Sequence, residues 1–197
     1  MIYNDAQAEQ IIKNRLSQRR YEHSVGVACT AEKMAAAAGL DPGKAYVTGI
    51  LHDYAKNLSD GQLLEVAQQA GLITDSIEEE SPDLLHAPVG AYLLQAGLGI
   101  RDAEILAAVR AHTLGSVGMS TLDKIVYLAD MIEPTRPTYP GLERLRQLAQ
   151  QDLDEAMLFG LESTIRHCLD GGRLLHPATV EARNEFLRRV KGKRPGG

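Results

Sequence analysis

The sequence predicts an all-α protein, folded as a single domain in an orthogonal helical bundle. Apolar residues recur at helical spacing along most of the 197 residues. No segment alternates apolar and polar residues with enrichment in β-branched and aromatic types, so we expect no strand. The predicted helices are short and unequal in length, which disfavours a long parallel bundle.

Local signals mark the first helices. The first has alanine, isoleucine and leucine at helical spacing, and the second stops at Gly39, as helices often do. Asp41 and Pro42 supply an N-cap and a first-turn proline for the third. Ser59 with Gln62 reads as a capping box that opens the fourth. The full set of expected helices covers approximately residues 5–16, 19–38, 42–53, 62–70, 82–96, 105–112, 120–131, 153–169 and 179–191.

Three segments between or after these helices are expected to be irregular. Residues 74–81 carry three consecutive glutamates and are predicted to form a solvated loop, after which Pro82 restarts a helix. The proline-punctuated stretch 133–141 cannot be helical throughout. The tail, residues 193–197, is expected to be frayed.

Composition excludes several classes of protein. A net charge of -5 argues against a general nucleic-acid binder, which would normally carry a basic face. The polar N-terminus is no signal peptide, and no apolar run approaches the roughly 20 residues that span a bilayer. Cys29 and Cys168 fit no metal or redox spacing and are expected to be small buried residues in a reducing compartment. The predicted location is cytoplasmic, with neither a nucleic acid nor a membrane as partner.

Histidines and aspartates interrupt apolar runs near the ends of different predicted helices. The run Gly49-Ile50-Leu51, for example, ends in His52 and Asp53. A lone histidine is more often a core or surface residue than a ligand. Burying several such groups without partners costs several kcal/mol each, so a shared cation that satisfies them together is the simpler explanation. The interrupting residues are His23, His52, Asp53, His86, His112 and Asp130.

The residue types of this set restrict the metal. Imidazole and carboxylate ligands suit iron, manganese, zinc or nickel, and the absence of thiolates argues against a structural zinc site. Side chains from separate rigid helices can converge on one ion with little loss of freedom. Glu22 and Asp123 are candidate carboxylates for orienting the imidazoles.

The order of these residues resembles a known pattern. His23, then His52-Asp53, then Asp130 match the H…HD…D order of the HD-domain metal-dependent phosphohydrolases, which are all-α. With His86 and His112, and with the segments HDYAK, LHAPVGA, VRAHT, YLADMIEPTR and HPATVEARN, the chain resembles the bacterial YqeK family over nearly its whole length. The resemblance implies an HD domain with accessory C-terminal helices over residues 1–192, and a flexible tail over 193–197.

The resemblance also implies an activity and a cofactor. The expected activity is hydrolysis of diadenosine tetraphosphate into two ADP, and the expected metal is most often iron, bound by the residues that match His23, His52, Asp53 and Asp130. His86 and His112 match positions that in related enzymes either bind a second metal or hold the substrate phosphates; phosphate contact is the preferred interpretation.

Further residues are expected to act on the substrate. A water on the metal would have its pKa lowered towards neutrality, and the resulting hydroxide, oriented by Asp53 or a neighbour, would attack an inner phosphorus. Lys56 would meet the charge on the departing ADP, and the planar fork of Arg136 suits phosphate. Arg110 is equally compatible with a solvent-facing role. The expected catalytic residues are Asp53, Lys56, His86 and His112.

The expected nucleotide contacts form a larger set. Asn57, Leu58 and Ser59 lead into a helix N-terminus, itself an anion site, and Thr113 adds a hydroxyl beside His112. Residues 173–177 resemble a family segment that lines the adenine pocket. The expected substrate-binding residues are His23, Lys56, Asn57, Leu58, Ser59, His86, His112, Thr113, Asp130, Arg136, Arg173, Leu174, Leu175, His176 and Pro177.

Three alternatives use the same ligand pattern. The first is an HD-type nucleotidase acting on a mononucleotide, the second a di-iron oxygenase, and the third a metal-stabilised nucleotide-binding module without turnover. Nothing in the sequence fixes the number of ions or the oligomeric state, for which a homodimer is one allowed assembly.

Overall fold

The computed structural model describes residues 5–193, in which helices joined by loops are the only regular elements and no strand occurs. The all-α prediction is therefore confirmed. The helices, in chain order, are α1 Asp5–Arg15, α2 Gln18–Ala37, α3 Pro42–Leu51, α4 Asp60–Ala70, α5 Ile77–Glu80, the 3-10 turn η1 Pro82–Leu85, α6 His86–Leu98, α7 Ala103–Ala111, α8 Thr121–Ile132, α9 Leu142–Gln151, α10 Leu153–Asp170 and α11 Pro177–Lys193.

Side-chain caps start the helices where the sequence predicts them. Asp41 accepts hydrogen bonds from the first-turn amides of α3, and Ser59 forms a reciprocal capping box with Gln62 at the start of α4. Ser120 and Asp123 form a second capping box at α8. Each cap satisfies amides that have no partner within the helix, which sets the starting point of the helix.

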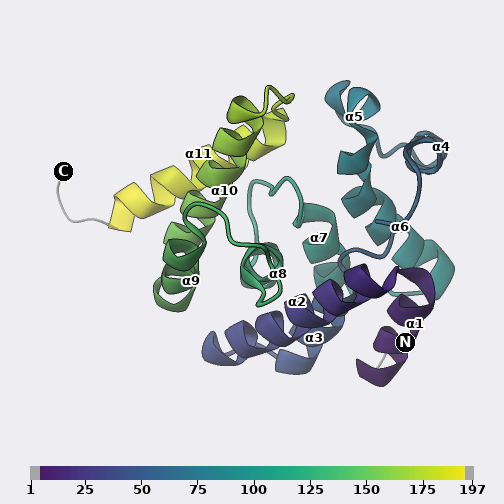
Figure 1. The fold of residues 1–197 in the computed structure, drawn as a ribbon, viewed down its shortest axis with the longest axis horizontal. Helices are drawn as coiled ribbons and strands as arrows, with labels where there is room; N and C mark the ends of the chain where they lie inside the picture. The colour runs from purple at the N-terminus through teal and green to yellow at the C-terminus, as the bar shows by residue number, and fades with distance from the viewer. Residues whose placement is uncertain (1–4, 194–197) are drawn as a thin grey trace.

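The helices cross at steep angles around a central pair. Figure 1 shows α7 and α8 in the middle, α9 to α11 on one side, α4 to α6 on the other, and α2 with α3 beneath. Helices α2 and α3 approach very closely, because a Cβ added at Gly49 would lie 2.8 Å from the Cα of Ala28. This contact places the end of α3 beside the first turns of α2, and those are the parts of both helices that carry histidine.

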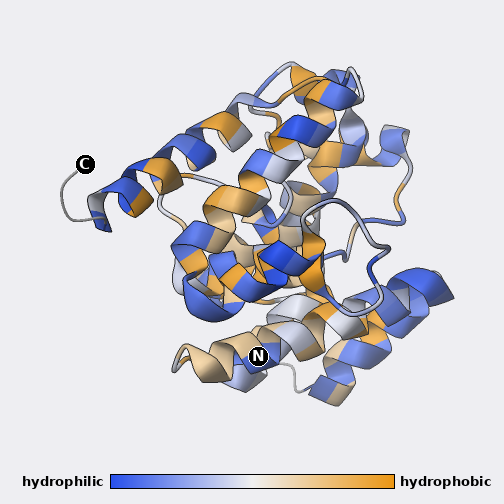
Figure 2. Ribbon diagram, turned by 60° about the vertical axis from the view of Figure 1, so that its left-hand side comes forward, coloured by the Kyte–Doolittle hydropathy of each residue, from blue (hydrophilic) through white to orange (hydrophobic). Residues whose placement is uncertain are grey.

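Burial follows the helical periodicity. In Figure 2 most helices carry both hydrophobic and hydrophilic residues along their length. The apolar residues gather in several clusters, one around α1, α3 and α6, another around α8, α9 and α10. Within the described residues, every helix falls short of the length and apolar character needed to cross a membrane.

Helix α9 is absent from the set predicted from sequence. Gly141, at its start, provides no side-chain cap, and the prolines just before it hide the onset of the helix. Its signal is the spacing of Leu142, Leu145 and Leu148, all of which are buried. The helix is short but strongly amphipathic, and it packs against α8 and α10.

The prediction of a solvated loop over 74–81 is wrong. A short helix, α5, occupies part of this segment, and the Glu78 side chain is buried at 3% exposure. Its carboxylate accepts hydrogen bonds from the backbone amides of Thr74 and Asp75, so three consecutive glutamates do not all face water.

The predicted C-terminal tail is only partly described. Lys193 is the last residue of α11, and residues 194–197 lie outside the described residues.

Candidate metal centre

Helix ends bring four imidazoles to one place. His52 directly follows the last residue of α3, and His112 directly follows the last residue of α7. His86 lies at the junction of η1 and α6, and His23 lies in the second turn of α2. The ring centroids of neighbouring pairs are 4.9 to 5.4 Å apart. The structure thus brings together all four histidines that the sequence singled out.

Three of these imidazoles are held by the same local bond. The Nδ1 atoms of His52 and His112 lie 2.7 Å from the carbonyl oxygens of Gly49 and Val109, three residues earlier. His86 makes the corresponding bond to the carbonyl three residues before it, at Asp83. A carbonyl oxygen can only accept, so Nδ1 carries the proton and Nε2 keeps its lone pair. Each ring therefore presents a metal-binding nitrogen to the interior.

The fourth imidazole is anchored by a distant carboxylate. Glu133, just beyond α8 and 1% exposed, accepts from His23 Nδ1 at 3.0 Å. The amide and hydroxyl of Thr135 donate to the same carboxylate at 2.6 and 2.8 Å. Gly26 leaves the room for it, because a Cβ there would lie 2.6 Å from Glu133 Oε2. The consequence is that His23 also directs Nε2 inwards.

Asp130 completes one group of ligand atoms. Its Oδ1 lies 2.9 Å from His23 Nε2 and 3.7 Å from His52 Nε2. The three ligand atoms of His23, His52 and Asp130 all lie within 4.8 Å of one another. Two imidazole nitrogens and a carboxylate oxygen from three helices, α2, α3 and α8, therefore converge as a metal requires.

Asp53 connects this group to the other two histidines. Its Oδ2 is 3.6 Å from His52 Nε2, and its Oδ1 is 3.5 Å from His86 Nε2 and 3.6 Å from His112 Nε2. The Nε2 atoms of His86 and His112 are 3.1 Å apart. Thr113 Oγ1 lies near both, but one hydroxyl proton can satisfy only one of them. Two facing lone pairs at this distance favour a shared cation or proton.

The donor set fits a bound metal. His52 Nε2 is fully buried and has no hydrogen-bond partner among the described residues, although the ring is held in place by its other nitrogen. An unpartnered buried nitrogen costs free energy, and a metal ion would satisfy it. Imidazole and carboxylate donors suit iron, manganese, zinc and nickel alike.

The electrostatics of the cluster keep its carboxylates ionised. Burial alone would raise the pKa of Asp53 and Asp130, but interaction with His52 and with His23 outweighs it and holds both values below the usual range. Burial lowers the pKa of His52, which keeps that ring neutral. For His23 burial also lowers the pKa, but Asp130 and Glu133 outweigh it and raise the value. Negative charge therefore concentrates where a cation would bind.

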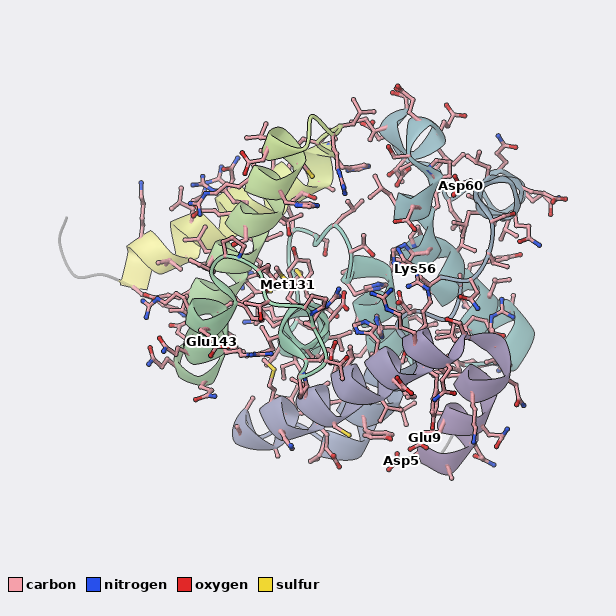
Figure 3. The ribbon with its side chains drawn as sticks, in the orientation of Figure 1. Asp5, Glu9, Lys56, Asp60, Met131 and Glu143 are labelled. Carbon is pink, nitrogen blue, oxygen red and sulfur yellow. The ribbon has the colours of Figure 1, made fainter. Side chains whose placement is uncertain are left out.

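A cavity of about 740 Å³ opens onto the cluster, and several cationic side chains line it. Lys56 Nζ pairs with Asp83 at 2.8 Å and lies 3.1 Å from His86 Nδ1. Arg20 lies 3.5 Å from Asp53, and Arg136 donates to both the carbonyl and the carboxylate of Asp130. In Figure 3, Lys56 and Met131, which line this cavity, lie towards the middle of the molecule.

A family model described as the HD domain matches residues 20–135, which contain every member of this cluster. The chain belongs to the HD-domain family. HD domains are metal-dependent, and the cluster supplies residues that could hold the metal.

The similarity extends over nearly the whole chain. A Halalkalibacterium halodurans protein named symmetrical bis(5′-nucleosyl)-tetraphosphatase is 38% identical over 184 residues, 93% of this chain and 97% of that protein. A Bacillus subtilis protein of the same name is 37% identical, over 89% and 94% of the two chains. The solved structure of a predicted HD superfamily hydrolase involved in NAD metabolism, from Clostridium acetobutylicum, is 35% identical, with a TM-score of 0.90 over 96% of this chain and 100% of that one.

Some predicted nucleotide contacts of this HD domain lie away from the cavity. The Asn57 side chain donates to the carbonyl of Arg15, Leu58 packs in a core cluster, and Ser59 caps α4. Residues 173–177 lead into α11, where His176 is buried and faces Glu78 at 3.6 Å. Their contact with a nucleotide stays a prediction, since none of them lines the cavity that opens onto the HD cluster.

Sequence reasoning missed two residues of the HD site and misplaced a role. Arg20 lies three residues before His23 on α2, and this spacing on one helix face is the only sequence signal that could have indicated it. Glu133 carried none, because it reaches His23 across 110 residues of sequence. The orienting carboxylate is therefore Glu133, whereas Glu22 pairs with Gln18 and Asp123 caps α8. Arg110 faces solvent.

Proposed function

We propose that this HD-domain protein hydrolyses diadenosine tetraphosphate symmetrically, releasing two ADP. The curated relatives that bear the name symmetrical bis(5′-nucleosyl)-tetraphosphatase cover almost the whole chain at 37 to 38% identity. The observation that carries the proposal is the convergence of His and Asp ligand atoms around the unpartnered Nε2 of His52, in a cavity lined by cations. Phosphoryl transfer needs this combination of positioning and charge neutralisation.

We assign the metal ligands to the two groups that Asp53 joins. His23, His52 and Asp130 would hold one ion together with Asp53, and His86 with His112 would hold a second against the other oxygen of Asp53. When bound, such ions supply an activated water at neutral pH and neutralise charge on phosphate oxygens. Iron is our first choice of metal, with manganese, nickel and zinc as alternatives.

Binding a metal ion through Nε2 is a better role for His86 than direct phosphate contact. Burial, together with His112 and Lys56, lowers the pKa of His86 to about 3, so the ring is neutral at working pH. With its Nδ1 proton directed to the carbonyl of Asp83, Nε2 offers only a lone pair. A phosphate oxygen is also an acceptor, and two acceptors repel. We therefore favour a second ion over the phosphate contact expected from the sequence.

The phosphates themselves are assigned to the cationic side chains. Arg136 and Arg20 each approach a carboxylate of the cluster and also line the cavity. Lys56 is held by Asp83 at 2.8 Å, which points its ammonium at the same space. Departure of ADP leaves negative charge on a bridging oxygen, and these side chains supply compensating positive charge without donating a proton.

A nucleotide panel tests the proposal. Protein purified without chelator is incubated with diadenosine tetraphosphate and with adenosine, inosine and deoxyadenosine monophosphates, and the products are separated by chromatography. We expect ADP as the sole product of the dinucleotide and no release of nucleosides. Appearance of AMP with ATP, or release of a nucleoside from a monophosphate, would contradict the proposal. Substrate-dependent oxygen uptake would instead support oxygenase chemistry.

A cytoplasmic location and a homodimeric assembly remain proposals. Cys29 and Cys168 lie in different helices as free thiols, which suits a reducing compartment. The substrate is a nucleotide, in line with the relatives.

A further inference from the structure

A second cavity adjoins the metal-centre cavity. It has a volume of about 580 Å³ and lies between the 136–140 loop and helix α10. The two cavities are adjacent, because four residues line both: Met131, Arg136, Pro137 and Thr164. Figure 3 shows one of these, Met131, near the middle of the molecule. We call this second space the Tyr139 cavity, after its aromatic lining residue.

We propose that the Tyr139 cavity receives one of the two nucleosides of the dinucleotide substrate. The inference rests on the proposed function, because only a substrate with a nucleoside at each end needs a second site. Cleavage at the central anhydride requires equal lengths of substrate on either side of the scissile bond. A volume of about 580 Å³ lies within the usual range for small-molecule sites, roughly 300 to 1,000 Å³.

The walls of the Tyr139 cavity suit a nucleoside. Tyr139 donates its hydroxyl hydrogen bond to the carbonyl of Met131 at 3.1 Å, which fixes the ring as a stacking surface. Pro137 and Pro140 add apolar wall beside it. Aromatic rings bind bases of any sequence because every base offers a π-face. The Tyr139 cavity therefore adds an aromatic and apolar wall beside the metal-centre cavity, which is lined mainly by charged and polar residues.

Polar side chains on α10 line the opposite side. Arg166 is two-thirds exposed and lies 3.7 Å from Glu162, a weak pairing that leaves the guanidinium able to turn towards a ligand. His167 and Asp170 line the same wall and are exposed. These groups can donate to and accept from ribose hydroxyls and base edges.

Arg136 stands where the two cavities meet. Two of the donors on its guanidinium hold the carbonyl and carboxylate of Asp130. The Arg136 side chain is about one-third exposed and lines both spaces. A polyphosphate that runs from the metal centre into the Tyr139 cavity would pass this cation, so phosphate and nucleoside recognition follow one path.

Comparison of two substrates separates the Tyr139 cavity from the metal centre. Diadenosine tetraphosphate carries two nucleosides, whereas adenosine 5′-tetraphosphate carries one and yields ADP and pyrophosphate when its central anhydride is cleaved. Tyr139→Leu should raise KM for the dinucleotide about tenfold, the size expected for loss of one base stack, while KM for adenosine 5′-tetraphosphate stays within twofold. Tyr139→Phe keeps the ring but loses the hydroxyl bond to the Met131 carbonyl, so its KM for the dinucleotide should rise less than that of Tyr139→Leu.

Two further variants keep the test independent of folding. His167→Ala alters an exposed side chain and should raise KM for the dinucleotide alone, by at least threefold. Tyr92→Leu, at an exposed tyrosine of α6 outside the cavity, serves as the matched control and should change neither constant. Equal changes for both substrates in Tyr139→Leu and His167→Ala, or no change for either, would overturn the proposal. A wild-type protein that cleaves neither substrate would instead refute the proposed function.

Discussion

One local device recurs among the histidines of this protein. His52, His86 and His112 each follow the last residue of a helical turn and donate Nδ1–H to the carbonyl three residues earlier. The carbonyls of Gly49 and Val109 lie in the last turns of α3 and α7 and have no partner within the helix, so one hydrogen bond satisfies the backbone and also fixes the imidazole tautomer. The carbonyl of Asp83 accepts the His86 backbone amide as well as its ring. The metal-binding nitrogen of these three rings is thus set by a local contact within three residues and needs no long-range partner.

His23 lacks such a carbonyl partner, and its orientation depends on Glu133. We expect Glu133→Gln to weaken metal binding by about 10- to 100-fold, because the side chain loses a charged acceptor that fixes the ring and raises its basicity. The measurement is a titration of metal-free protein with Mn²⁺ or Zn²⁺. Glu22→Gln is the matched control, since Glu22 lines the same cavity but pairs with Gln18. Equal affinities for both variants would contradict this role.

The room that Gly26 leaves for Glu133 can be tested separately. Gly26→Ala places a Cβ 2.6 Å from Glu133 Oε2, so the carboxylate must move and His23 loses its anchor. We expect a loss of metal affinity comparable to that of Glu133→Gln. Gly97→Ala, also in a helix but with no atom within 4 Å of the new Cβ, should leave the affinity unchanged. If Gly26→Ala bound metal with wild-type affinity, the space that Gly26 leaves for Glu133 would have no role in metal binding.

At the scale of helices, the sequence predicts where most helices begin, but it misses two features of the fold. The caps at Asp41 and Ser59 are local signals that the structure confirms, and the structure adds a capping box at Ser120. Helix α9 and the buried Glu78 of α5 escape prediction, because the first lacks a side-chain cap and the second is stabilised by backbone amides that a composition rule does not see.

The same division holds for the candidate site. The histidines and aspartates that converge are recognisable, because each interrupts an apolar run near a helix end. Their partner Glu133, and the position of Asn57 turned towards Arg15, depend on contacts between residues far apart in sequence. Local pattern therefore predicts which residues gather, while packing decides which of them face the cavity.

The start of α10 offers a prediction about pH. Asp154 receives hydrogen bonds from Lys193 at 2.8 Å and Lys124 at 2.9 Å, joining α10 to α11 and α8. Burial alone would raise the pKa of Asp154, but these lysines outweigh it and lower the value. The carboxylate therefore adds stability that is present above the unfolded-state pKa of about 3.9 and is lost as pH falls through the folded value.

Asp154→Asn should accordingly lower the free energy of unfolding by about 1 kcal/mol at pH 7. Below about pH 3.9 the difference between the variant and the wild type should shrink, because the wild-type carboxyl is then losing its charge. Urea unfolding of both proteins at pH 7 and pH 3 measures it. A difference that is the same at both pH values would contradict the assigned ion pairs.

At the scale of the whole molecule, the metal would tie separate helices together. The ligands come from α2, α8 and the ends of α3 and α7, with His86 at the start of α6, so the complete site exists only in the folded chain. A ligand that binds only the native state at 100 times its dissociation constant adds about 2.7 kcal/mol to stability.

Removal of metal should therefore lower Tm. For a chain of this size the expected shift is about 5 to 10 °C, from the usual 2 to 4 °C per kcal/mol. Differential scanning calorimetry before and after chelation, with metal restored in a third sample, measures it. If protein shown to contain metal kept the same Tm after chelation, the bound metal would not contribute to the stability of the fold.

The central claim is that imidazole and carboxylate groups from separate helices hold a metal that the hydrolysis requires. The most direct measurement is elemental analysis of wild type and His52→Ala, purified in parallel without chelator, together with assay of ADP release. We predict a transition metal in the wild type, loss of metal and activity together in His52→Ala, and unchanged helical content by circular dichroism. A His52→Ala protein that keeps its metal, or that hydrolyses the dinucleotide without it, would contradict the account.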